Sequence, residues 1–178
     1  EKAPIDFLEV ELSILEKMGL KFEITPSGVS ENGITKLATL TLHPSELTAF
    51  PEKIHPLPYP GLNIDNLPFF AIIGTQATGT TFIHDWVYEK RAIYYTELER
   101  FGAETQLLDP HRIMISGPRH LRASEIICPP ALRPATILLI GALVAEGTST
   151  LRNIYSINRG YEDLASRIRS IGGDITHA

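Results

Sequence analysis

Three arginines stand at positions where they could bind an anion. Arg91 and Arg159 each follow a β-prone segment, at the same distance after a Gly-Thr pair that begins at Gly79 or Gly147. Arg133 falls in the first turn of a predicted apolar helix, where unpaired backbone N–H groups favour negative charge. Arginine binds carboxylate and phosphate oxygens through paired hydrogen bonds, so together they could clamp an anionic substrate. For each one, the alternative is an ion pair with a neighbouring carboxylate or exposure to solvent.

Asp65 is the carboxylate best placed to act as a base. It follows a proline-rich stretch and precedes a predicted helix over residues 69–76. A carboxylate in such a loop could accept a proton from a substrate hydroxyl. The alternative is that Asp65 caps the helix N-terminus. Glu89, close to Arg91, could orient that arginine, but a solvated side chain is the favoured interpretation.

No metal or cofactor site is predicted. The six histidines are scattered without metal-ligand spacing, and there is neither a phosphate-binding glycine loop nor a G-x-S-x-G motif. The single cysteine, Cys128, precedes two prolines and is expected to be a buried small apolar residue rather than a nucleophile. Trp86, within a predicted strand, is expected in the core or half-buried.

Internal repetition defines the predicted architecture. Residues 79–91 (GTTFIHDWVYEKR) and 147–159 (GTSTLRNIYSINR) have the same length, begin with Gly-Thr and end with arginine. A second phrase, a helix end followed by glycine and a strand start, recurs at Gly19, Gly102 and Gly172. We therefore predict three copies of one α/β unit, over about residues 1–48, 49–118 and 119–178, with the first and last copies incomplete. The chain is expected to be a piece of a longer protein.

Hydrophobic periodicity and turn residues place the elements of each unit. The predicted helices cover residues 4–18, 69–76, 94–101, 131–145 and 161–171. The predicted strands cover residues 21–25, 35–42, 81–87, 104–108, 112–116, 124–128 and 148–155. The first two strands are expected to be joined by a turn at 26–28, and residues 43–63, with five prolines, to be an irregular connection.

Composition excludes several classes of protein. The chain has 178 residues, 43% of them hydrophobic and 21% charged, as in ordinary globular domains. A net charge of −5 argues against a general nucleic-acid binder. The longest apolar run is too short to cross a membrane, and the first residues do not resemble a signal peptide. A lone cysteine suits a reducing compartment, so a cytoplasmic location is predicted.

Five stretches of the chain resemble the bacterial enolpyruvyl transferases. They are PYPGLNID (58–65), GTTFIHDWVYEKR (79–91), ELERFGAE (97–104), ALRPATILLIGALVAEGTSTL (131–151) and NRGYEDL (158–164). The similarity extends over about residues 6–175. It implies an α/β (α+β) fold of repeated β-α-β-α-β-β units in a pseudo-threefold arrangement, with helices packed inside sheets as an inside-out α/β barrel. The family has two such domains, so residues 1–178 would be most of one domain, with a second domain as partner.

The resemblance also implies an activity and its residues. Similarity is greatest to the branch that transfers the enolpyruvyl group of phosphoenolpyruvate to the 3-hydroxyl of UDP-N-acetylglucosamine in peptidoglycan synthesis. By this resemblance Asp65 contacts the sugar hydroxyl as the proposed base, Val87 contacts the nucleotide sugar, and Arg91 lies close by in the active site. Arg133 and Arg159 would hold phosphoenolpyruvate. No cofactor is implied.

The sequence also departs from the family pattern. Ala131 replaces an aspartate of the catalytic cleft, and the family's Glu-Asn-Arg and Asp-Arg-Gly-Tyr phrases contain Lys90 and Asn158 here. The family's catalytic loop and its lysine-asparagine pair would precede this chain, and Cys128 does not match that loop. This chain alone is therefore expected to be inactive. The alternatives are an enzyme acting on shikimate 3-phosphate, a non-catalytic relative that binds a nucleotide sugar, and a scaffold whose repeats serve only folding.

Overall fold

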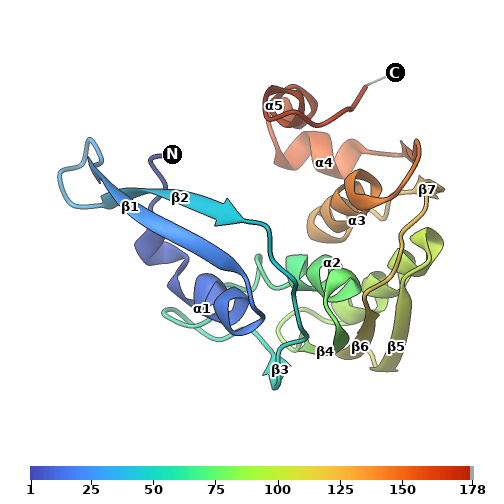
Figure 1. Cartoon of the computed structure of the whole chain (residues 1–178). Helices are drawn as coiled ribbons and strands as arrows, with labels where there is room; N and C mark the ends of the chain where they lie inside the picture. Colours follow the sequence, from blue (N-terminus) through green and yellow to red (C-terminus); the bar gives the residue numbers. More distant parts are fainter. Residues whose placement is uncertain (177–178) are drawn as a thin grey trace.

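The first part of the chain is a helix followed by a β-hairpin. In the computed structural model, which describes residues 1–176, a 3-10 turn η1 (Ile5–Phe7) leads into α1 (Glu9–Lys17), and β1 (Lys21–Val29) pairs antiparallel with β2 (Lys36–His43) (Figure 1). Gly19 follows the helix with a φ of 101°, the left-handed conformation expected of a C-cap glycine. The predicted turn at 26–28 is wrong. The strand continues through a register shift between Pro26 and Gly28, and the chain reverses at 30–35, where Asn32 Oδ1 accepts two backbone N–H groups.

The second part contains the predicted unit in full. Its elements are β3 (Lys53–Ile54), α2 (Phe69–Gln76), β4 (Gly79–His84), the 3-10 helix η2 (Arg91–Phe101), β5 (Glu104–Asp109) and β6 (Arg112–Gly117). They form a sheet of order β3-β4-β6-β5, in which β3 is parallel to β4 and the other pairs are antiparallel. Strand β3 is not predicted from the sequence, because it has only two residues within the proline-rich segment.

The third part repeats the beginning of this plan. Its elements are β7 (Glu125–Ile127), α3 (Leu132–Val144), β8 (Thr150–Arg152), α4 (Tyr155–Gly160) and α5 (Leu164–Ser170), with β7 parallel to β8. The predicted strand over 148–155 is too long, and the predicted helix over 161–171 corresponds to the shorter α5. The strand ends at Arg152 and α4 begins at Tyr155. Asp163, with a φ of 41°, separates α4 from α5 and caps the latter through Ser166 N–H.

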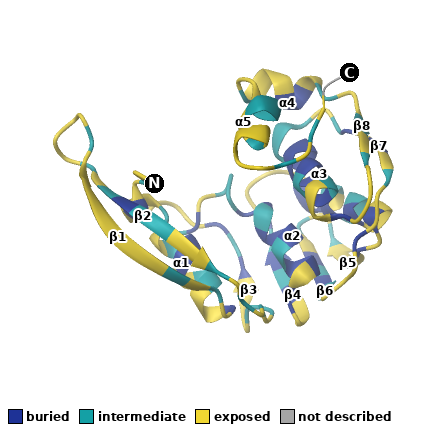
Figure 2. Cartoon of the chain, turned by 45° about the horizontal axis from the view of Figure 1, so that its top comes forward, coloured by how far each residue is buried: buried dark blue, intermediate teal, exposed yellow. Residues whose placement is uncertain are grey.

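The two most apolar helices form the centre of the fold. Helices α2 and α3 contact each other, and α2 also contacts β4 and β6, so that the strands lie outside the helices (Figure 2). Most residues of both helices are buried, as expected for helices that are apolar around their whole circumference. Close packing requires Gly141 of α3, because a Cβ there would lie 3.1 Å from the ring of Phe101. Within residues 1–176, no helix has the length and apolar character needed to cross a membrane.

The repeated Gly-Thr pairs adopt the same backbone conformation. Gly79 has a φ of 108° and Gly147 a φ of 96°. A Cβ at Gly79 would meet Cβ of Ala49, and a Cβ at Gly147 would meet Cβ of Ala123. In both units, glycine is thus favoured by a left-handed φ next to an alanine, at the first residue of β4 and three residues before β8.

Candidate functional site

Three of the predicted site residues line one pocket of about 360 Å³. Asp65 lies in the turn before α2, Arg91 begins η2, and Arg133 lies in the first turn of α3. Two repeat units therefore contribute to one concave site. The full lining is Asp65, Tyr88, Glu89, Arg91, Tyr94, Ala131, Leu132, Arg133 and Pro134.

Asp65 and Arg133 form an ion pair across this pocket. Arg133 Nη2 lies 3.1 Å from Asp65 Oδ2, and both side chains are partly exposed. The expectation that Asp65 is an N-cap is wrong: α2 begins after Pro68, and no side chain caps it. Arg133 Nη1 also donates to the hydroxyl of Tyr161 at 3.2 Å. The carboxylate is therefore available to the pocket and is neutralised by an arginine from the other unit.

Arg91 is held in a buried ion pair. Its Nε and Nη2 donate to the carboxylate of Asp85 at 2.5 and 3.0 Å, and Nη2 also donates to the carbonyl oxygen of Ile64 at 2.7 Å. Asp85 is fully buried and accepts a third hydrogen bond from the hydroxyl of Tyr95. Burial, followed by the neighbouring Asp85 carboxylate, raises the pKa of Tyr95, so its hydroxyl keeps the donated proton. The sequence analysis did not identify Asp85 or Tyr95. An acidic residue directly after a buried strand was the available signal.

Arg159 lies apart from the other site residues. It is exposed on α4, with its guanidinium carbon 5.8 Å from the centre of the Tyr155 ring. It lines neither the pocket described above nor the one described below. The equivalent positions of Arg91 and Arg159 in the repeats therefore do not bring both side chains to this pocket. Tyr161, which accepts from Arg133, connects the end of α4 to the pocket.

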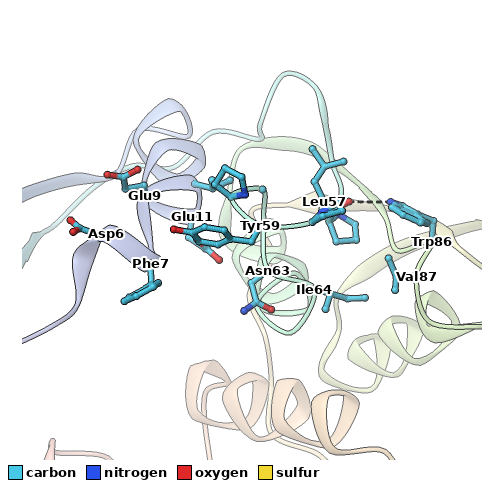
Figure 3. Close-up of a pocket in the computed structure, with 15 residues that line it drawn as sticks. Asp6, Phe7, Glu9, Glu11, Leu57, Tyr59, Asn63, Ile64, Trp86 and Val87 are labelled. Atoms are coloured by element: carbon cyan, nitrogen blue, oxygen red, sulfur yellow. Dashed lines mark hydrogen bonds between the residues drawn. The ribbon is translucent and has the colours of Figure 1, made fainter. Parts of the chain in front are cut away.

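Val87 lines a second pocket, of about 500 Å³ (Figure 3). Trp86 also lines this pocket. It is 46% exposed, half-buried rather than in the core, and its Nε1 donates to the carbonyl oxygen of Pro56. The two pockets share a wall, since Ile64 and Val87 face the second pocket while their neighbours Asp65 and Tyr88 face the first. The second pocket is lined by apolar groups, Asn63 and the carboxylates of Asp6, Glu9 and Glu11, without any lysine or arginine. It therefore suits an uncharged group better than a phosphate.

The helix start beside the ion pair lacks a side-chain cap. Ala131 is the N-cap residue of α3, has an extended conformation, and lines the pocket with Arg133. Glu89 at the pocket edge is 75% exposed, in line with the solvated side chain expected from the sequence. Cys128 is buried, as predicted, and burial raises the pKa of its thiol. Across residues 1–176, no group of histidine, cysteine and acidic side chains is arranged to hold a metal ion.

Comparisons with known proteins agree with this architecture. The sequence model of EPSP synthase (3-phosphoshikimate 1-carboxyvinyltransferase) matches residues 2–168. Two relatives named UDP-N-acetylglucosamine 1-carboxyvinyltransferase, from Treponema denticola and Bacteroides thetaiotaomicron, are 42% and 40% identical over 120 and 122 residues. Each match covers 67% of this chain and 28% of the relative, so the chain spans only part of their length.

Solved structures of the same family have a similar fold. The enolpyruvyl transferase NikO from Streptomyces tendae is 30% identical, with a TM-score of 0.77 over 96% of this chain and 37% of its own. EPSP synthase from Acinetobacter baumannii is 16% identical, with a TM-score of 0.70 over 93% of this chain and 39% of its own, and supports the fold alone. The repeated α/β units with helices inside the sheets are thus those of known enolpyruvyl transferases. The chain belongs to the EPSP synthase family of enolpyruvyl transferases.

Proposed function

We propose that the intact protein containing this chain transfers the enolpyruvyl group of phosphoenolpyruvate to the 3-hydroxyl of UDP-N-acetylglucosamine. The observation that carries the proposal is the pocket that joins Asp65, Arg91 and Arg133 from two repeat units. The names of the matched relatives support this acceptor over shikimate 3-phosphate. In this proposal the chain is most of one domain, a second domain completes the cleft, and the reaction serves peptidoglycan synthesis in the cytoplasm.

Asp65 is the proposed base for the sugar hydroxyl. As the hydroxyl oxygen bonds to carbon 2 of phosphoenolpyruvate, the hydroxyl proton must leave and carbon 3 takes up a proton. Carbon 3 then loses a proton as inorganic phosphate departs, which restores the double bond. A carboxylate within hydrogen-bond reach can accept that proton. The ion pair with Arg133, at 3.1 Å, occupies this carboxylate. An anion that binds Arg133 competes with Asp65 for the guanidinium and so frees the carboxylate for this task.

Arg133 and Arg159 are the proposed partners of phosphoenolpyruvate. Arg133 faces the pocket from the N-terminal turn of α3, where guanidinium and backbone N–H groups both favour an anion. Arg159 is exposed and has no carboxylate partner among the ion pairs of residues 1–176, so its charge remains available to a ligand. Tyr161 ties the chain beside Arg159 to Arg133. The two arginines would approach the anion from α3 and α4.

Val87 and Arg91 are the proposed neighbours of the nucleotide sugar. Val87 faces the pocket that carries carboxylates and no basic group, which favours the uncharged portion of the sugar over its diphosphate. Arg91 borders the adjoining pocket beside Asp65. The wall between the pockets thus presents the proposed sugar contact and the proposed base on neighbouring segments.

A second candidate function follows from Ala131. This residue occupies the uncapped start of α3 inside the pocket, where the resemblance to enolpyruvyl transferases leads us to expect an aspartate. Loss of an acid from the catalytic pocket favours a relative that binds the nucleotide sugar without transferring the enolpyruvyl group.

The two functions are separated by one set of measurements on the intact protein. We would measure phosphate release with phosphoenolpyruvate and UDP-N-acetylglucosamine, and repeat it with shikimate 3-phosphate as acceptor. Turnover with the nucleotide sugar supports the transferase, whereas calorimetric binding of that sugar without turnover supports the binding protein. Turnover with shikimate 3-phosphate alone would overturn the proposed acceptor. Absence of both turnover and binding would leave the scaffold interpretation.

A further inference from the structure

The buried carboxylate of Asp85 connects to the proposed base through one arginine. Asp85 is fully buried and binds Nε and Nη2 of Arg91, at 2.5 and 3.0 Å. The same Nη2 donates to the carbonyl oxygen of Ile64 at 2.7 Å. Ile64 directly precedes Asp65, so this hydrogen bond attaches the backbone next to the base to the start of η2.

Asp85 also fixes the direction in which Arg91 points. A guanidinium bound through two nitrogens to one carboxylate has a defined orientation. Tyr95 donates to the same carboxylate from the next turn of η2, which keeps the Asp85 side chain in place. Arg91 is itself 5% exposed, so water offers little competition for these contacts.

Asp65 is thereby held from two sides. Its backbone is attached through Ile64 to Arg91, and its side chain meets Arg133 at 3.1 Å. A general base must lie within hydrogen-bond distance of the proton that it accepts, so the position of this backbone sets the geometry of the reaction. A displacement of about 1 Å can lower the rate roughly 100-fold.

We propose that Asp85 is a positioning residue, which directs Arg91 onto the carbonyl group of Ile64 and so places Asp65 at the pocket. Arg91 then acts chiefly on the protein backbone, and only its side facing the pocket remains for a substrate. This inference rests on the proposed function, because it requires Asp65 to act as the base.

The test is a double-mutant cycle on the intact protein. Asp85→Asn keeps the shape of the side chain and removes its charge, and Tyr95→Phe is a milder variant that removes one donor to Asp85. Each substitution is introduced into the wild-type protein and into the Asp65→Asn variant. For every protein, kcat and the KM for both substrates are measured. Ile113→Val, a conservative change in the buried core away from the pocket, controls for effects of lower stability on the rate.

We expect Asp85→Asn to lower kcat roughly 10-fold to 100-fold, with a smaller change in the KM for phosphoenolpyruvate. In the Asp65→Asn background, the same substitution should have no further effect on kcat, because the group that it positions is gone. Tyr95→Phe should show the same pattern with a smaller loss, and it carries the test if Asp85→Asn does not fold.

Each other outcome has a separate meaning. An equal fold-loss in both backgrounds would overturn the positioning role and leave the proposed function intact. A full rate in Asp65→Asn would overturn Asp65 as the base, and this proposal with it. If the intact protein binds UDP-N-acetylglucosamine without turnover, the cycle is measured as affinity for that ligand, and additive losses again overturn the positioning role.

Discussion

Arg91 and Arg159 occupy the same position in two repeat units, yet their surroundings are opposite. Counted back by the same number of residues from each arginine, the second unit has Asp85 and the third unit has Asn153. Asp85 is buried and binds Arg91. Asn153 is exposed and neutral, and its amide lies 3.5 Å from the carbonyl oxygen of Cys128. The buried arginine thus has a carboxylate partner six residues earlier in the chain, whereas the exposed arginine has a neutral amide at that position and is available to a ligand.

The comparison shows what the repeat preserves. Gly79 and Gly147 share a left-handed φ and a close approach to an alanine, so this backbone feature recurs in both units. The chain after the strand differs: it enters a 3-10 helix at Arg91 but an α-helix four residues before Arg159. Equivalent sequence position thus predicts equivalent scaffold, whereas the use of a charged side chain depends on which partners fold against it.

The most severe test of this comparison removes the carboxylate that separates the two units. Asp85→Ala leaves Arg91 buried without its counter-ion, which should lower the free energy of unfolding by about 3–5 kcal/mol. Asn153→Ala changes the equivalent exposed residue, whose φ of 58° is left-handed, so it should lower the free energy of unfolding by only about 1 kcal/mol. Urea denaturation of the intact protein, followed by circular dichroism, measures both. Equal losses in the free energy of unfolding would show that Asp85 and Asn153 contribute equally to stability, contrary to this comparison.

The next test concerns ligand affinity. Arg159→Ala should weaken phosphoenolpyruvate binding by about 1.5–3 kcal/mol, the scale of a hydrogen bond to a charged group. The free energy of unfolding should hardly change, because the side chain is exposed. Isothermal titration of phosphoenolpyruvate into the intact protein without the nucleotide sugar, so that no turnover occurs, gives the affinity. Arg167→Ala on α5 is the matched control, and an equal loss there would mean that only general positive charge matters.

Substitutions at Ala131, the N-cap of α3, should have a smaller effect, on stability and on kcat separately. Ala131→Asp and Ala131→Asn should each stabilise the protein by about 1 kcal/mol, because both side chains can cap a helix N-terminus that has no cap. Only the aspartate supplies an acid to the pocket, so a gain in kcat is expected for Ala131→Asp alone. Thermal unfolding and phosphate release measure the two parts. A rate gain shared by both variants would assign it to the cap rather than to the acid.

Much of the fold could be predicted because repetition and hydrophobic pattern agree. Helix α2 has the predicted bounds and α3 nearly so, since their apolar runs begin next to a proline in the first turn. The hairpin β5–β6 follows from the turn at Asp109 and Pro110. The turn of the first hairpin was misplaced, because Pro26 and Gly28 are typical of turns but here form a bulge within β1. Short elements such as β3 and α4 have too few residues to show a period.

The site could be predicted in part. Asp65, Arg91 and Arg133 were selected as groups after strands or before helices, and the fold brings them to one pocket. The partners of these groups could not be predicted, because an acidic residue after a strand, such as Asp85, does not reveal which arginine it contacts in the folded chain. The interpretation of Asp65 as a helix cap is wrong because α2 begins four residues later, directly after Pro68.

The hairpin turns of the first and second units are held by similar side-chain hydrogen bonds, and substitutions there should change stability least. Asn32 Oδ1 accepts the N–H groups of Ile34 and Thr35, and Asp109 Oδ1 accepts those of His111 and Arg112 in the same manner. Only in the second turn is the accepting side chain a carboxylate. The hydrogen bond from His111 N–H, followed by that from the Arg112 side chain, lowers the pKa of Asp109.

A lowered pKa in the folded state means that the ionised Asp109 stabilises the protein above its usual pKa of about 4. This contribution should disappear as the pH falls through the lower value of the folded state. Asp109→Asn keeps the acceptor oxygen and removes the charge, so the difference in urea midpoint from wild type should be largest near neutral pH and shrink in acid. Asn32→Ala should give a difference that does not change with pH. A pH-independent effect of Asp109→Asn would mean that the carboxylate acts there only as a hydrogen-bond acceptor, as the amide of Asn32 does.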